Sequence, residues 1–231
     1  MLRGVVFDLD GVIVDSHPLH KQAWRAFLAS MGKEVSDSDL DFILEGRRRR
    51  DILIHFLGAL SDSEIQEYGK RKDHFFQQSC ANLQAVVGTV EIIKDLDKAA
   101  LRIALATSAS RNRARWTLQQ LKLSQYFDVV VTGDDVIESK PDPTIYHLAA
   151  QNLRIPPEYL LAVEDSVCGV LSAKAAGLRC LAIGNAANVP ELLQAGAHRV
   201  IPNLVNLSIA ELEQLFTASL GSAGGYESVQ V

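Results

Sequence analysis

Cysteine is scarce in this sequence, which holds only Cys80, Cys168 and Cys180 in 231 residues. The number is odd and the spacing matches no metal-ligand pattern, which argues against a disulfide framework and a cysteine-based zinc site. We expect all three to be buried as small apolar side chains in a reducing compartment.

Long apolar stretches are also missing. No segment approaches the roughly 18 uninterrupted apolar residues that a membrane-spanning helix needs. Asp8 and Asp10 interrupt the apolar run near the N-terminus, which argues against a signal peptide. We therefore expect a cytoplasmic protein with no membrane partner.

Basic residues do not outnumber acidic ones. The formal net charge is −5 and the isoelectric point is about 5.7, which argues against a general nucleic-acid-binding protein. The chain is 48% hydrophobic and 22% charged, as expected of a globular protein with a sizeable core. We expect a monomer with no nucleic-acid partner.

What is present is organised around the first fifteen residues. The short apolar run 5–7 predicts a buried strand, and Asp8, Asp10 and Gly11 follow it directly. Carboxylates are expensive to desolvate, so we expect them at the carboxyl end of a central parallel strand, where α/β sheets bind ligands. Asp8 could then be a nucleophile or a metal ligand, and Asp10 a proton-transfer group. The alternative is a turn that merely ends a strand.

The next segment has a helical pattern and no convincing strand. It predicts about four helices, at residues 19–31, 40–44, 52–57 and 61–76. We expect residues 15–82 to form a small helical domain inserted after the first strand.

Strands and helices alternate in the rest of the chain. Strands are predicted at 101–107, 127–131, 159–163 and 179–184, and helices at 90–96, 114–121, 144–151 and 169–176. This order predicts an α/β fold with a doubly wound, mostly parallel, Rossmann-like sheet. We expect residues 1–14 and 83–216 to form this core, and the Gly/Ser-rich residues 217–231 to be a flexible tail.

Reactive side chains follow three of the predicted strands and one loop. They are Asp8 and Asp10, Thr107 and Ser108, Glu164 and Asp165, and Lys140. Each has an ordinary explanation by itself, as a helix cap, a turn residue or a solvated charge. All of them, however, fall at the same edge of one sheet. Carboxylates, hydroxyls and a cation at one place predict a site for Mg²⁺ and a phosphate.

These residues resemble the four motifs of the haloacid dehalogenase superfamily. The motifs are Asp8-Leu9-Asp10-Gly11-Val12, Thr107, Lys140 within Lys140-Pro141-Asp142-Pro143, and Glu164-Asp165-Ser166. The resemblance implies that Asp8 attacks phosphorus to form an aspartyl phosphate and that Asp10 transfers protons. It also implies Mg²⁺ held by Asp8, the Asp10 main-chain carbonyl and Asp165, with Glu164 binding directly or through water. The helical block would be a mobile cap.

Within the superfamily the chain resembles β-phosphoglucomutase and the related sugar-phosphate phosphatases. The resemblance implies that His20 positions the acid/base aspartate. It also implies that the arginine run 47–50 holds a substrate phosphate through Arg49, or through Arg48 or Arg50 if the register is shifted by one.

Two further positions bear on specificity. Lys72 matches a substrate-contacting lysine, and Ser108 is a candidate phosphate donor beside Thr107. Asp73 stands where the mutase has an asparagine, a departure that weakens the case for mutase specificity. We interpret Arg111, Arg113 and Arg115 as surface charges.

The leading hypothesis is a Mg²⁺-dependent phosphatase that hydrolyses a small phosphorylated metabolite, with a sugar phosphate as the first candidate. A mutase of the β-phosphoglucomutase type and a phosphoglycolate phosphatase are alternatives with the same first step. A non-catalytic protein that binds a phosphorylated metabolite is the alternative of another class.

Overall fold

A computed structural model describes residues 1–44, 47–80 and 83–217 of the chain. Its centre is a six-stranded sheet with the order β3-β2-β1-β4-β5-β6, and every pairing is parallel. The strands are β1 Gly4–Phe7, β2 Arg102–Thr107, β3 Val129–Thr132, β4 Leu160–Glu164, β5 Arg179–Ile183 and β6 Arg199–Ile201. The doubly wound parallel sheet is thus confirmed.

The first strand lies in the middle of this sheet and is buried along its whole length. Phe7 pairs with Leu105 of β2 and with Val163 of β4. The next residues of these three strands therefore leave the sheet at one edge. This register brings Asp8 close to the ends of β2 and β4.

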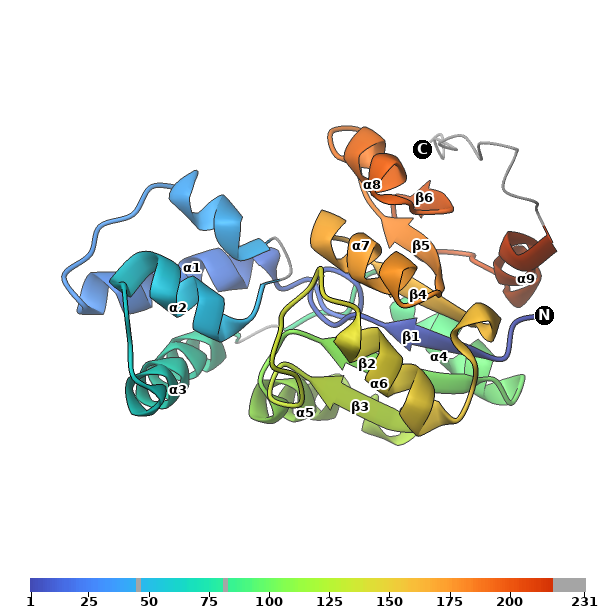
Figure 1. The fold of residues 1–231 in the computed structure, drawn as a ribbon, viewed down its shortest axis with the longest axis horizontal. Coiled ribbons are helices and arrows are strands. Elements are labelled where there is room, and N and C mark those ends of the chain that lie inside the picture. The colour runs from blue at the N-terminus through green and yellow to red at the C-terminus, as the bar shows by residue number, and fades with distance from the viewer. Residues whose placement is uncertain (45–46, 81–82, 218–231) are drawn as a thin grey trace.

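Helices cover both faces of the sheet (Figure 1). They are α4 Thr89–Lys98, α5 Arg111–Gln120, α6 Thr144–Leu153, α7 Val167–Ala175, α8 Val189–Ala195 and α9 Ile209–Thr217, with short 3₁₀ helices η2 Ser124–Tyr126 and η3 Pro157–Tyr159. Side chains alternate between two hydrophobic clusters, as the two-residue period of a strand requires: Val5 and Phe7 pack in one cluster and Val6 in the other. The sequence pattern predicts no element where α8, β6 and α9 form.

The helices after β1 gather at one end of the molecule, away from the sheet (Figure 1). They are α1 His17–Ser30, η1 Asp39–Leu44, α2 Arg49–Leu57 and α3 Asp62–Ser79, and they share a third hydrophobic cluster of their own. We call this group the cap. The limits 15 and 82 for an inserted domain stay a prediction, and the predicted tail lies outside the described residues except for its first residue.

The prediction of an ordinary helix at residues 40–44 of the cap is wrong in helix type. Residues 39–44 form a 3₁₀ helix of six residues. Leu40 and Ile43 are its buried side chains, and their spacing of three aligns them in a helix of three residues per turn.

None of the helices in the described ranges is long and apolar enough to cross a membrane.

All three cysteines are free, but only Cys180 is buried, so the expectation of three buried cysteines is wrong. Cys80 follows the last turn of α3 and Cys168 lies in the first turn of α7, and helix ends are less enclosed than the sheet.

One buried polar group suggests a stability test. Thr117 on α5 is fully buried, and its hydroxyl oxygen has no hydrogen-bond partner among the described residues. An unsatisfied buried hydroxyl costs ~1–3 kcal/mol, so we expect Thr117→Val to raise the free energy of unfolding by about 1 kcal/mol. For a chain of this size that is a rise in Tm of roughly 2–4 °C, measurable by calorimetry.

Thr117→Ser is the matched control, because it keeps the hydroxyl and should not raise Tm. A lower Tm for the valine variant would show that the hydroxyl is hydrogen-bonded in solution.

Candidate active site

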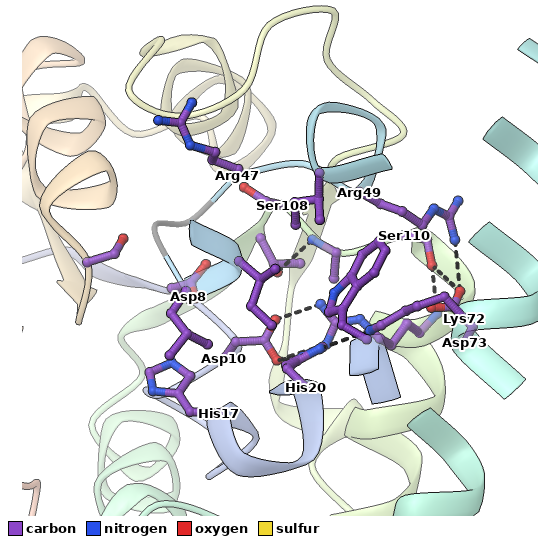
Figure 2. A pocket seen from close by; sticks show the side chains of 18 of the residues that line it. Asp8, Asp10, His17, His20, Arg47, Arg49, Lys72, Asp73, Ser108 and Ser110 are labelled. Atoms are coloured by element: carbon purple, nitrogen blue, oxygen red, sulfur yellow. Dashed lines mark hydrogen bonds and ion pairs between the residues drawn. The ribbon is translucent and has the colours of Figure 1, made fainter. Parts of the chain in front are cut away.

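A pocket lies where the cap meets the carboxyl edge of the sheet (Figure 2). Its walls include Asp8, Asp10, Thr107, Ser108 and Asp165 from the core side and His20, Arg49 and Lys72 from the cap. The cavity volume is about 70 Å³, well below the ~300–1,000 Å³ typical of small-molecule sites. The free volume between the cap and the core is therefore small.

Asp8 and Lys140 form a buried ion pair at the base of this edge. The Lys140 ammonium donates to Asp8 Oδ1 at 2.7 Å, to Glu164 Oε1 at 2.5 Å and to the Ala106 carbonyl at 3.1 Å. The lysine is only 2% exposed, and its three donors match these three acceptors. Asp8, Lys140 and Glu164 therefore lie together, as the sequence predicts.

Burial and charge set the protonation of this pair. Burial raises the pKa of Asp8 to about 8, against the lowering effect of Lys140 and with the help of Glu164 and Asp165. Burial would lower the pKa of Lys140, but the charges of Asp8 and Glu164 outweigh it and raise the pKa. Lys140 is therefore a permanent cation, whereas Asp8 needs further positive charge to be fully ionised.

Glu164 is fully buried and its carboxylate is held on both oxygens. Tyr146 donates to Oε1 at 2.7 Å, and the hydroxyl of Ser166 donates to Oε2 at 3.2 Å. The carboxylate also passes so close to Gly169 that a Cβ there would lie 2.0 Å from it. Glu164 is thus a fixed anchor for Lys140.

Three carboxylates at this edge could hold a metal ion. Asp8, Glu164 and Asp165 each offer an oxygen, and these oxygens lie within 4.8 Å of one another. Hard oxygen donors of this kind fit Mg²⁺. Their mutual repulsion, which contributes to the raised pKa values of Asp8 and Asp165, is what a divalent cation would relieve. The residues present therefore fit the expected metal.

His17, at the start of α1, pairs with one of these carboxylates. Its Nε2 lies 3.0 Å from Asp165 Oδ2. Burial would lower the pKa of His17, but the hydrogen bond and charge of Asp165 outweigh it and raise the pKa to about 9. Both side chains pack against Gly11, which has a positive φ of 76° and whose missing Cβ would overlap Asp165. Glycine is required at this turn.

Thr107 ends β2 and lies in the pocket wall with Ser108. The Thr107 Oγ1 accepts a hydrogen bond from the Ala109 backbone N–H at 3.1 Å. This contact orients the hydroxyl, whose own hydrogen can be donated to a phosphoryl oxygen. The predicted hydroxyl pair thus borders the same pocket as Asp8.

The carboxylate of Asp10 has its own set of partners (Figure 2). Ser16 Oγ donates to its Oδ1 at 2.6 Å, and His20 Nε2 lies 3.0 Å from the same oxygen. Ser16 precedes α1 but does not cap it, because its hydroxyl is directed to Asp10. His20 therefore contacts the acid/base candidate, as the resemblance implies.

The interpretation of Arg113 as a surface charge is wrong. Its guanidinium is buried and donates to both oxygens of Asp10, at 2.8 Å and 2.6 Å. Helical periodicity could have found it: Arg113 lies on the same face of α5 as the buried Thr117, four residues later. Arg111 and Arg115 are exposed, as expected.

A chain of contacting polar side chains extends from Asp10 into the cap. Burial would raise the pKa of Asp10, but Arg113 and His20 outweigh it and hold it well below its usual value. Burial, with the charge of Lys72, lowers the pKa of His20 to about 3, so the ring is neutral. The Lys72 ammonium contacts its Nδ1 at 2.9 Å, and burial lowers the pKa of Lys72 to about 7. Lys72 thus supports His20, and direct contact with substrate stays a prediction.

The four arginines at positions 47–50 have different surroundings. Arg47 and Arg49 line the pocket (Figure 2), whereas Arg48 and Arg50 do not line it. Arg48 pairs with Asp51 and donates to two carbonyls of the core, and Arg50 pairs with Asp62.

Arg49 already has an anionic partner. Its guanidinium lies 2.8 Å from Asp73 on α3, and Asp73 also accepts a hydrogen bond from Ser110 of the core at 3.2 Å. Of Arg48, Arg49 and Arg50, Arg49 lines the pocket and is therefore the candidate to bind a charged group of the substrate. Its charge, however, is largely balanced by Asp73.

Comparison with known proteins agrees with this geometry. A family model described as haloacid dehalogenase-like hydrolase matches residues 5–183. The chain is 35% identical over 200 residues to the phosphorylated carbohydrates phosphatase of Thermotoga maritima, covering 85% of this chain and 92% of that protein. It is 31% identical over 215 residues to hexitol phosphatase A of Escherichia coli, covering 92% and 93%.

A solved structure has the same fold. The crystal structure of CbbY from Rhodobacter sphaeroides in complex with phosphate matches with a TM-score of 0.83 and 28% identity. The match covers 92% of this chain and 100% of that chain.

The raised pKa of Asp8 predicts a pH-dependent metal affinity. Below about pH 8 Asp8 holds a proton that a divalent cation must displace, so proton and metal compete. We expect the affinity for Mg²⁺ to rise by up to ~10-fold per pH unit between pH 6 and 8 and then to level off. Isothermal titration in two buffers of different ionisation enthalpy measures both the affinity and the protons released.

The matched control is Asp97→Asn, which removes an exposed carboxylate of α4 and should change nothing. An affinity that stays constant from pH 6 to 8 would contradict the assignment of Asp8 to the metal.

Proposed function

The chain belongs to the haloacid dehalogenase-like hydrolase family, and on this basis we propose that it is a Mg²⁺-dependent phosphatase of small carbohydrate phosphates. The observation that carries the proposal is the buried Asp8 of the pocket wall, which accepts a hydrogen bond from Lys140 and lies next to Glu164 and Asp165. The names of the two relatives, a phosphorylated carbohydrates phosphatase and a hexitol phosphatase, support the substrate class.

Asp8 is the proposed nucleophile. Its carboxylate attacks phosphorus, the bond from phosphorus to the leaving oxygen breaks, and an aspartyl phosphate forms. Lys140 keeps positive charge beside Asp8 throughout, because its pKa is raised by two carboxylates. Thr107 and Ser108 donate hydrogen bonds to phosphoryl oxygens from the end of β2, where they border the same pocket.

The metal would be held by Asp8, Asp165 and the Asp10 main-chain carbonyl, with Glu164 close enough to take part. When bound there, Mg²⁺ supplies the charge that lets an anionic carboxylate approach an anionic phosphate.

Asp10 is the proposed acid and base. Because its pKa is low, Asp10 is ionised in the free protein, so the proton that it donates to the leaving oxygen arrives with the substrate, on the phosphate monoanion. In the second step Asp10 takes a proton from the water that hydrolyses the aspartyl phosphate. Its contacts with Ser16 and His20 support this role, because they connect the proton-transfer group to the start of α1, the first helix of the cap. Closure of the cap would then exclude bulk water while Asp10 is in position.

The charge balance of the cap favours a monophosphate as substrate. Arg49 and Arg47 are the two arginines of this run in the pocket wall, and Asp73 pairs with Arg49. A neutral polyol can hydrogen-bond to such a pair, whereas a second phosphate must compete with Asp73. This supports hydrolysis of a sugar or polyol monophosphate over transfer between the positions of a bisphosphate.

The nucleophile gives the direct test. Asp8→Asn should lower the turnover of sugar phosphates by at least ~10⁴-fold, because the amide cannot form the phospho-enzyme. Release of inorganic phosphate measures the rate, and circular dichroism checks the fold. Magnesium-dependent activity that survives in this variant would contradict the mechanism.

The same assay separates the alternatives. With β-glucose 1-phosphate and a bisphosphate primer, free phosphate indicates a phosphatase, whereas glucose 6-phosphate indicates a mutase. Phosphoglycolate belongs in the substrate panel. A wild-type protein that turns over none of these, and whose Tm is unchanged by Mg²⁺ with beryllium fluoride, would be the binding protein of the other class.

The Asp73–Arg49 pair gives a test of specificity. Asp73→Asn removes the competing anion, so we expect kcat/KM for a sugar bisphosphate to rise roughly tenfold relative to the monophosphate, equal to ~1.4 kcal/mol. Arg49→Ala in the Asp73→Asn background should abolish that gain. If the ratio of the two substrates stays constant in both variants, Arg49 does not contact the distal group.

A further inference from the structure

Arg113 is the buried charge that the proposed mechanism leaves without a role. It lies on α5 of the core, 103 residues from Asp10 in sequence, and its side chain is 9% exposed. Its two terminal nitrogens donate to the two oxygens of Asp10, one to each. A pair of this bidentate kind fixes the plane of the carboxylate as well as its position.

The partners of Asp10 are divided unequally between its oxygens. Oδ1 accepts from Arg113 and Ser16 and lies 3.0 Å from His20 Nε2. Oδ2 accepts from Arg113 alone, as far as the described residues show. A carboxylate oxygen has two lone-pair directions, so Oδ1 is saturated and Oδ2 has one free. Oδ2 is therefore the oxygen able to exchange a proton with a ligand.

The partners of Asp10 also come from two different parts of the molecule. His20 belongs to α1 of the cap, and Phe76 of α3 stacks on its ring with a centroid distance of 4.5 Å. The same Phe76 ring lies 5.5 Å from the Arg113 guanidinium. Arg113 itself belongs to the core. When the cap moves, His20 and Phe76 move with it, and Arg113 stays beside the sheet.

We propose that Arg113 is a positioning residue that holds the acid/base carboxylate of Asp10 on the core and leaves Oδ2 to transfer the proton. This inference rests on the proposed phosphatase function. In the first step Oδ2 passes to the leaving oxygen the proton that it has taken from the phosphate monoanion, Asp8 bonds to phosphorus, and the bond from phosphorus to the leaving oxygen breaks. In the second step water gives its proton to Oδ2, its oxygen bonds to phosphorus, and the bond from Asp8 to phosphorus breaks.

Leaving-group dependence tests this role, because only a poor leaving group needs the proton. Arg113→Met should lower kcat/KM for a sugar phosphate by ~10²–10³-fold, the range of general acid catalysis. p-Nitrophenyl phosphate should lose less than ~10-fold, because its phenolate departs without protonation. Arg115→Met, an exposed arginine two residues along the same helix, is the matched control and should leave both rates unchanged.

Two further variants keep the test decisive. Arg113→Lys retains a cation but lacks the two terminal nitrogens that contact both oxygens of Asp10, so its kcat/KM for the sugar phosphate should lie between those of wild type and Arg113→Met. If Arg113→Met does not fold, Arg113→Lys takes its place in the comparison. In an Asp10→Asn background, Arg113→Met should add little further loss, because Arg113 acts through Asp10.

Equal losses on the two esters, or losses that multiply in the Asp10→Asn background, would overturn the inference while leaving the phosphatase function intact. A wild-type protein inert toward both esters would overturn the proposed function, and this inference with it.

Discussion

The site depends on the neutralisation of one carboxylate, Asp8, at the buried end of the central strand. An ion removed from water without partners costs several kcal/mol, so Asp8 requires a cation at its side. Lys140 is that cation, and because it is buried as well it needs Glu164 and the Ala106 carbonyl. Glu164 in turn needs Tyr146. The compensation thus extends across β1, β2, β4 and α6, and only a parallel sheet brings these ends together.

The same requirement, applied to Asp10, connects the core to the cap. Its carboxylate is stabilised by an ion pair with Arg113 of the core and by contacts with Ser16 and His20, which lie at the start of the cap. Lys72 adds a further cation behind the neutral His20 ring. Asp10 therefore has its full set of partners only where the two parts meet. Under the proposed function, closure of the cap completes the surroundings of the proton-transfer group.

Much of the site could be predicted because it follows strand ends. Asp8, Thr107 and Glu164 each leave a buried strand, and parallel strands share one carboxyl edge, so their convergence follows from local pattern alone. Residues on the inserted helices are different. The pattern and the resemblance together indicated Arg49 and Lys72, but neither could indicate that Asp73 pairs with Arg49 or that Lys72 lies behind His20.

By itself the sequence determined the order of strands and helices as far as β5, the chemical groups at the sheet edge and the helical nature of the insert. Periodicity and turn residues act over a few residues, so they can be seen without a structure. The tertiary structure decided which charges meet. Arg113 reaches Asp10 across 103 residues, and a 3₁₀ helix replaces the predicted helix at 40–44. Such pairings depend on how separate helices pack, which no local pattern specifies.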